Sequence, residues 1–224
     1  MSLQVEKVKA ILFDIDGTLS DSDDRMVQRV SNYLSPLIRD HARRKTFARW
    51  IVMAAESPGN YFYNLADRFA LDSFLIKQIH RFSKRKQHQV KAYWIIPGVI
   101  EMLQALSHLK LGVVSARDER TTMAFLEQFK ITLYFDVIVS SQTCEYTKPF
   151  PDPLLHAAEK LDTPAENCLM VGDTTVDIKA ARLAGMQSIA VLCGFGREKE
   201  LRRAGPDLIL PATTDILPYF SDKE

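Results

Sequence analysis

The stretch AILFDIDGTL, residues 10–19, guides the interpretation of the whole chain. An apolar run from Val8 to Phe13 ends in a carboxylate, Asp14, and a second carboxylate, Asp16, follows two residues later. Short apolar runs that end at polar turn residues are typical of buried parallel strands. We therefore expect Asp14 at the carboxyl end of a strand, which is the edge where open α/β sheets bind ligands.

The spacing of these two carboxylates predicts a charged site. Alternation along an extended chain places Asp14 and Asp16 on the same side, and Gly17 then allows the backbone to turn sharply. Two carboxylates in one pocket repel each other unless a cation joins them or one takes a proton. The stretch by itself is explained by a metal site, by an acid–base pair, or by a strand end followed by an ordinary polar turn.

Length and composition limit the classes of protein to consider. With 224 residues and 46% hydrophobic content, the chain can bury one core, or form one domain with a sizeable insertion. A net charge of +1 favours neither a nucleic acid polymer nor a membrane surface as partner. The sequence has neither an apolar segment of membrane-spanning length nor a recognisable secretory signal. With three cysteines, it predicts reduced thiols and a cytoplasmic location.

The hydrophobic patterns divide the chain into two parts. Residues 20–94 follow helical spacing, with no convincing strand among them. Strands and helices alternate from residue 95 onwards, and strands are expected at 109–115, 135–140, 168–171, 188–192 and 207–210. Such alternation predicts a Rossmann-like three-layer sandwich with a mainly parallel sheet and right-handed crossovers. We expect an α/β core made of 1–19 and 95–224, interrupted by an all-helical domain at 20–94.

Polar side chains at the expected strand ends are far apart in sequence but meet at one edge of such a sheet. They are Asp14, Asp16, Ser115, Lys148, Asp173 and Asp177. Taken singly, each is also explained by a strand-end cap, a solvated loop lysine or an acid on a first helical turn. Together, carboxylates without histidine or cysteine favour a hard cation such as Mg²⁺, and an added ammonium group suits a phosphate. A carboxylate can also attack phosphorus directly.

At this point the residues carry a family resemblance. Four segments resemble, in order, the four motifs of the haloacid dehalogenase (HAD) superfamily: Asp14–Thr18, Val113–Ser115, Lys148–Pro153 and Gly172–Asp177. The insertion after the first motif resembles the helical cap of the phosphoglycolate-phosphatase-like branch, as do residues 191–196. The resemblance covers about the whole chain, and it makes the 1–19 and 95–224 part the catalytic core and 20–94 the cap.

The resemblance implies a role for each matching residue. Asp14 is the expected nucleophile, and Asp16 is the expected general acid/base, with Thr18 orienting it. Mg²⁺ is the implied cofactor, and its implied ligands are Asp14, Asp16 (through its carbonyl), Asp173 and Asp177. The implied catalytic set is Asp14, Asp16, Lys148 and Ser115, and the implied phosphate-binding and substrate-binding set is Thr18, Ser115, Ala116, Arg117 and Lys148. Ala116-Arg117 departs from the commoner Asn-containing pair, which leaves the role of Arg117 open.

The resulting expectation is a Mg²⁺-dependent phosphomonoesterase that acts through an aspartyl-phosphate. Its substrate is expected to be a small phosphorylated metabolite: phosphoglycolate-like, a sugar phosphate or a nucleotide. A β-phosphoglucomutase-like phosphomutase or a pyrophosphatase is the alternative. A 2-haloacid dehalogenase is disfavoured by Asp16, and a non-catalytic binding protein by the intact carboxylates. We expect no nucleic acid polymer or membrane as partner, and a monomer or homodimer.

Overall fold

The computed structural model describes residues 3–21, 30–35, 38, 40, 44, 47–48 and 93–220. The chain divides into two compact units: Met1–Ser22 with Ala92–Glu224, and Asp23–Lys91. The first unit contains every element described below. The helices expected within 20–94 lie almost entirely outside the described residues, so the helical character of that segment stays a prediction.

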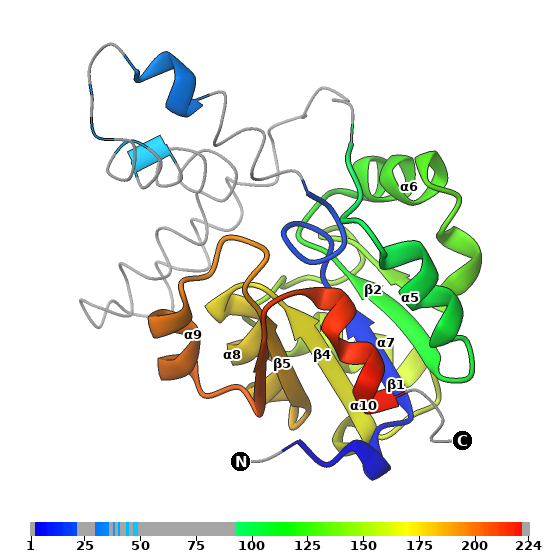
Figure 1. Cartoon of the computed structure of the whole chain (residues 1–224). Coiled ribbons are helices and arrows are strands. Elements are labelled where there is room, and N and C mark those ends of the chain that lie inside the picture. The colour runs from blue at the N-terminus through cyan, green and yellow to red at the C-terminus, as the bar shows by residue number, and fades with distance from the viewer. Residues whose placement is uncertain are drawn as a thin grey trace. The chain divides into compact units, whose positions relative to one another are not determined.

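The first unit is built on a six-stranded sheet in which every paired strand is parallel to its neighbour (Figure 1). The strand order is β3-β2-β1-β4-β5-β6. The bounds are β1 Ala10–Phe13, β2 Lys110–Val114, β3 Val137–Val139, β4 Cys168–Gly172, β5 Gln187–Val191 and β6 Leu208–Leu210. The predicted Rossmann-like α/β core is confirmed, including all five strands expected after residue 95, although several are one to three residues shorter than expected.

Strand β1 shows how the sequence alternation builds the layers. Ile11 and Phe13 point into one hydrophobic cluster, whereas Ala10 and Leu12 point into the other, on the opposite face of the sheet. All four side chains are fully buried because helices cover both faces. The continuous apolar run at 8–13 therefore reflects a strand that is buried on its two sides, as is usual for parallel sheets.

The helices divide between these two clusters. The first cluster receives residues of α5 (Val99–Ala105), α6 (Glu119–Gln128) and α10 (Leu217–Phe220). The second receives residues of α7 (Asp152–Lys160) and α8 (Thr175–Ala184). A shorter helix, α9 (Glu198–Ala204), buries Leu201 against α8 and β5. Among the described residues, no helix has the length and hydrophobicity needed to cross a bilayer.

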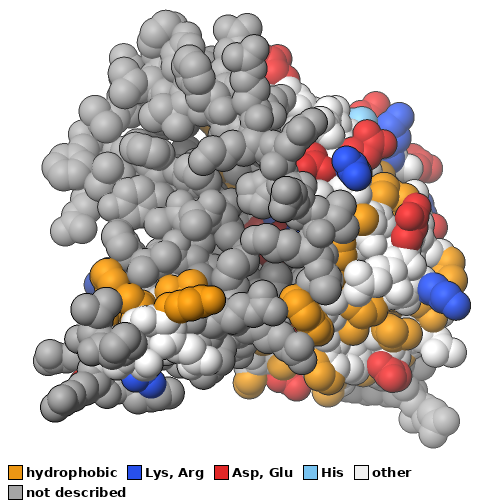
Figure 2. All heavy atoms as spheres, turned by 90° about the horizontal axis from the view of Figure 1, so that it is seen from above, with side chains coloured by type: hydrophobic (Ala, Val, Ile, Leu, Met, Phe, Trp, Pro, Cys, Tyr) orange, Lys and Arg blue, Asp and Glu red, His pale blue; other side chains and the backbone are white. Residues whose placement is uncertain are grey.

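The sheet order places β1 between β2 and β4, so the chain leaves β1 in one direction for β2 and β3 and later returns to its other side for β4. The loops that follow β1, β2 and β4 meet at such a switch point, which is the usual ligand site of open α/β sheets. Figure 2 views the molecule from above, and acidic and basic side chains are interspersed on the described surface that it shows. This agrees with the net charge of +1.

Candidate active site

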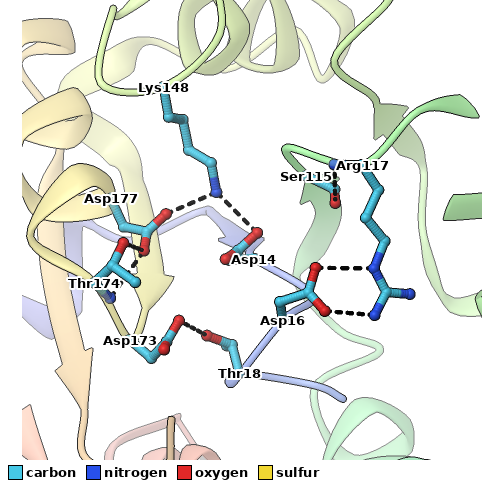
Figure 3. Close-up of polar contacts among 9 residues, drawn as sticks. All are labelled: Asp14, Asp16, Thr18, Ser115, Arg117, Lys148, Asp173, Thr174 and Asp177. Atoms are coloured by element: carbon cyan, nitrogen blue, oxygen red, sulfur yellow. Dashed lines mark hydrogen bonds and ion pairs between the residues drawn. The ribbon is translucent and has the colours of Figure 1, made fainter. Parts of the chain in front are cut away.

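The loop after β1 is a tight turn that separates the two carboxylates. The amide of Asp14 still pairs with the carbonyl of Val171 on β4, at 3.0 Å. Beyond it, the amides of Leu19 and Ser20 both donate to the carbonyl of Ile15, at 2.9 and 2.8 Å. Gly17 has a φ of 73°, a conformation that side chains with a Cβ disfavour. The turn leaves Asp14 and Asp16 at the same edge of the sheet but with different cationic partners (Figure 3).

Lys148 is the cationic partner of Asp14. It comes from the loop between β3 and α7, and its side chain is only 3% exposed. Its Nζ lies 2.9 Å from Asp14 Oδ1 and 2.7 Å from Asp177 Oδ1, so one ammonium group bridges two carboxylates. This burial excludes the alternative explanation of Lys148 as a solvated loop lysine. Burial by itself lowers the pKa of Lys148, but the two carboxylates outweigh burial and raise it.

Asp173 lies at the end of β4 and is completely buried. Its Oδ2 accepts a hydrogen bond from the amide of Phe195 at 2.7 Å, and its Oδ1 accepts one from the Thr18 hydroxyl at 3.4 Å. We expected Thr18 to orient Asp16, whereas the hydrogen bond that its hydroxyl donates goes to Asp173. The carbonyl of Thr18 is held in turn by the Thr213 hydroxyl at 2.6 Å, which ties the turn after β1 to the C-terminal part of the chain.

Asp177 lies on the first turn of α8 and faces inward, with 1% of its surface exposed. Its Oδ2 accepts hydrogen bonds from the amide and the hydroxyl of Thr174, at 3.0 and 2.6 Å, as part of a capping box. Its Oδ1 accepts from Lys148. The Asp177 side chain therefore takes part in capping the start of α8 and also contacts Lys148. By contrast, α7 begins at Asp152 without a side-chain cap.

These side chains create an excess of negative charge. One oxygen each from Asp14, Asp173 and Asp177 lie within 4.8 Å of one another, all three residues are buried, and Lys148 is the ammonium group that contacts two of them. Burial raises the pKa of Asp14 from 3.8 to about 7; Lys148 opposes this shift, and Asp177 adds to it. Burial, together with the neighbouring carboxylates of Asp177 and Asp14, also raises the pKa of Asp173 well above its usual range.

A divalent cation fits this donor set. Clustered carboxylate oxygens without nitrogen or sulfur ligands are the environment that Mg²⁺ prefers. Three buried carboxylates face the single ammonium group of Lys148, and burial together with their mutual repulsion raises the pKa of Asp14 and of Asp173, so a bound cation would relieve the repulsion. Asp14, Asp173 and Asp177 are the residues whose side chains would hold it, and the expected contribution of the Asp16 carbonyl stays a prediction.

Arg117 is the cationic partner of Asp16. From the loop between β2 and α6, its Nε lies 2.9 Å from Asp16 Oδ2 and its Nη2 lies 2.5 Å from Oδ1, which is a bidentate ion pair. Burial by itself lowers the pKa of Arg117, but Asp16 outweighs burial and raises it. The amide of Arg117 donates to Ser115 Oγ at 3.1 Å, and the Ser115 hydroxyl can still donate its own proton. Ala116 lies between them and is exposed.

The structure thus brings most of the sequence-predicted residues together at one edge of the sheet. Asp14, Lys148, Asp173 and Asp177 form one cluster, which we call the carboxylate cluster. Asp16 and Arg117 form a second, separate pair. Their roles in catalysis are not tested by this geometry and stay proposals.

Sequence analysis missed the contribution of the loop after β5. Besides the Phe195 amide on Asp173, the backbone of Gly194 passes so close to Asp173 that a Cβ there would overlap with Asp173 Oδ2. A Cβ at Gly196 would overlap with the backbone carbonyl of Asp173. The sequence signal was present in Cys193–Gly196, where two glycines flank a phenylalanine directly after a strand. Such glycines indicate a close approach of backbone to another group.

Comparison with known proteins supplies the family. The family model described as haloacid dehalogenase-like hydrolase matches residues 11–191, which includes all four motifs. The chain belongs to the haloacid dehalogenase-like hydrolase family. This hydrolase is 28% identical over 221 residues to a protein named pyrophosphatase PpaX from Bacillus mycoides, and the match covers 96% of this chain and 98% of the relative.

Two solved structures are similar along nearly the whole chain of the hydrolase. A protein described as a predicted phosphoglycolate phosphatase from Haemophilus somnus is 25% identical with a TM-score of 0.66, covering 95% of this chain and 97% of its own. A haloacid dehalogenase-like hydrolase from Streptococcus pneumoniae is 23% identical with a TM-score of 0.67, and the match covers 96% of this chain and 99% of its own. The second likeness supports the fold alone.

Proposed function

We propose that this hydrolase is a Mg²⁺-dependent phosphatase that acts on a small phosphorylated metabolite through an aspartyl-phosphate at Asp14. The observation that carries the proposal is the carboxylate cluster: three buried carboxylates and one buried ammonium group at the ends of β1 and β4. A phosphoryl group needs charge neutralisation above all, and an under-compensated carboxylate cluster that can bind a cation supplies it. The family match to a hydrolase agrees with this chemistry.

Each residue of the site has a task in this reaction. Asp14 attacks phosphorus through a carboxylate oxygen, and Lys148, 2.9 Å from Asp14 Oδ1, balances charge between nucleophile and phosphoryl group. The Ser115 hydroxyl and the Ala116 amide hold phosphoryl oxygens. Asp16 donates a proton to the departing oxygen and later takes one from water. When bound by Asp14, Asp173 and Asp177, Mg²⁺ would neutralise the negative charge that accumulates at this edge.

Pyrophosphate and phosphoglycolate are the first substrates to test. Pyrophosphate is suggested by the name of the Bacillus mycoides relative, and phosphoglycolate by that of the Haemophilus somnus protein. Both carry a second anionic group beside the reacting phosphorus. Sugar phosphates and nucleotides stay open, as does the phosphomutase alternative. A cytoplasmic location and a monomeric or dimeric state also stay predictions.

The test is phosphate release from pyrophosphate, phosphoglycolate, sugar phosphates and nucleotides, each with Mg²⁺ and with EDTA. The expected result is release from one or a few compounds, abolished by EDTA and by Asp14→Asn. Glu166→Gln, a carboxylate removed in the 3-10 helix Ala165–Asn167 before β4, serves as the matched control and should retain activity. Release that persists in EDTA would contradict the metal requirement. No release from any compound by folded protein would contradict the phosphatase.

A further inference from the structure

The ion pair between Arg117 and Asp16 engages both oxygens of the carboxylate. Both oxygens of Asp16 accept a hydrogen bond from the guanidinium group, one from Nε and one from Nη2. The Asp16 side chain is nevertheless 31% exposed, whereas that of Arg117 is 12% exposed. Asp16 is therefore held in one orientation from the buried side while water or a departing group can still approach it.

Two aromatic rings fix the guanidinium group from behind. The Cζ atom of Arg117 lies 4.9 Å from the ring centre of Tyr93 and 5.2 Å from that of Phe125. The two rings also pack edge to face, 5.9 Å apart, and Phe125 is fully buried. Gln128 anchors the Tyr93 backbone to α6 through a 3.0 Å hydrogen bond. Contacts of cations with aromatic faces are favourable, and they restrict Arg117 to the position that reaches Asp16.

The third nitrogen of the Arg117 guanidinium group, Nη1, does not contact the carboxylate cluster. Nη1 is buried and has no hydrogen-bond partner among the described residues. In Figure 3 it points away from both Asp16 and Asp14. A guanidinium group that bound the substrate phosphate would present a free donor towards Asp14. Here the N–H of Nε and one N–H of Nη2 are engaged by Asp16.

We propose that Arg117 is a positioning residue that holds the Asp16 carboxylate in the orientation from which it accepts the proton of the hydrolytic water. This proposal rests on the proposed function and concerns its second step, the hydrolysis of the aspartyl-phosphate. It replaces the sequence-based expectation that Arg117 binds the phosphate. The bidentate geometry matters because only a planar fork fixes both carboxylate oxygens at once.

The reaction takes two steps, and Asp16 transfers a proton in each. In the first, an Asp14 oxygen forms a bond to phosphorus, the bond from phosphorus to the departing oxygen breaks, and Asp16 supplies a proton to that oxygen. In the second, water oxygen attacks phosphorus, Asp16 takes one water proton, and the bond from phosphorus to the Asp14 oxygen breaks with its electron pair returning to Asp14. Inorganic phosphate leaves, and Asp16 again carries the proton that the next first step uses.

An activated aryl ester separates the two steps. p-Nitrophenolate departs without needing a proton, so its kcat/KM reports formation of the aspartyl-phosphate with little help from Asp16. Hydrolysis of the aspartyl-phosphate enters kcat alone. General acid–base catalysis contributes about 10²- to 10⁴-fold, and a misoriented Asp16 would lose part of that. We therefore expect Arg117→Gln to lower kcat by roughly 10- to 100-fold.

The experiment measures p-nitrophenyl phosphate turnover with Mg²⁺ by stopped flow and in the steady state. For Arg117→Gln we expect KM to fall with kcat, kcat/KM to stay within about two-fold, and a burst of one p-nitrophenol per active site. Arg117→Lys should recover part of kcat, because an ammonium group restores charge but not the two parallel hydrogen bonds. Arg120→Gln, an exposed arginine on α6, is the matched control and should behave as wild type.

The alternatives give different patterns. If Arg117 binds the phosphate, KM rises and kcat/KM falls, which overturns the proposal and leaves the phosphatase standing. If Arg117 only supports the fold, kcat falls at constant KM and the burst shrinks below one per site, which also overturns it. Folded wild-type protein that releases neither p-nitrophenol nor phosphate from any of the metabolites above would overturn both the proposal and the phosphatase. Unfolding temperatures of all variants show whether each one is folded.

Discussion

Asp14→Asn should stabilise the metal-free protein while abolishing catalysis. Asp14 is buried beside Asp173 and Asp177, and Lys148 compensates only part of their charge. An asparagine has nearly the same shape, keeps a carbonyl oxygen that can face Lys148, and carries no charge at any pH. The substitution therefore removes the most direct source of repulsion at the site, so an inactive variant is expected to be harder to unfold than the active protein.

The pKa of Asp14 gives the magnitude. Because its pKa rises from 3.8 to about 7 on folding, the folded protein keeps a proton that the unfolded chain releases between these values. The free energy of unfolding therefore falls as the pH rises through this window, and the loss is complete above about pH 7. At ~1.4 kcal/mol per pKa unit, the loss is about 4 kcal/mol at pH 8 and roughly 1.5 kcal/mol at pH 5. Asparagine avoids both losses.

Thermal unfolding in EDTA at pH 8 and pH 5 tests this reasoning. At ~2–4 °C per kcal/mol for a chain of this size, Asp14→Asn should raise Tm by roughly 10 °C at pH 8 and by about 4 °C at pH 5. Asp16→Asn is the matched control with the opposite sign, because it leaves the buried Arg117 without its partner. A lower Tm for Asp14→Asn at pH 8, or an equal gain at both pH values, would refute the argument.

Three further substitutions probe the groups around the cluster. Lys148→Met should lower Tm in EDTA by the equivalent of about 3–5 kcal/mol, since it leaves two buried carboxylates uncompensated, and added Mg²⁺ should restore part of the loss. An unchanged Tm would contradict this. Gly194→Ala should push Asp173 out of place and weaken Mg²⁺ binding roughly ten-fold or more by calorimetry. Gly205→Ala is strained by a φ of 76°, but its Cβ would meet open space, so it should leave Mg²⁺ binding unchanged. Thr174→Val should cost about 1 kcal/mol in urea unfolding, because Asp177 loses its hydroxyl partner; a cost near zero would mean that the capping box is not needed.

The sequence predicted the sheet and its functional edge well because both depend on local signals. Apolar runs and the residues that end them determined the strands, and the rule that parallel strands share one edge brought the strand-end residues Asp14 and Asp173 together. The role of Gly17 was also predictable from the sequence, because the turn after β1 has a φ of 73° at this position and glycine adopts such a value readily. The buried position of Lys148 was beyond such signals, because a lone loop lysine has no pattern that reports burial.

The contacts that the sequence did not predict are those made by tertiary packing. The family resemblance implied that Thr18 orients Asp16, but the Thr18 hydroxyl donates across the site to Asp173. Arg117 was placed in the phosphate-binding and substrate-binding set with its role left open, and the structure shows Tyr93 and Phe125 holding its guanidinium group on Asp16. The partner of Thr18 and the partner of Arg117 each lie in a different loop from the residue itself. The spacing of residues within one segment cannot predict such a contact.

The sheet order explains why two carboxylates only two residues apart have such different surroundings. Because β1 lies between β2 and β4, the turn after β1 is approached from both sides. The loop after β4 brings Asp173 to one side, where negative charge exceeds positive and a cation is needed. The loop after β2 brings Arg117 to the other, where the charge of Asp16 is already matched. A nucleophile beside a metal and a proton carrier held by an arginine can therefore arise from one short motif, provided that different loops flank it.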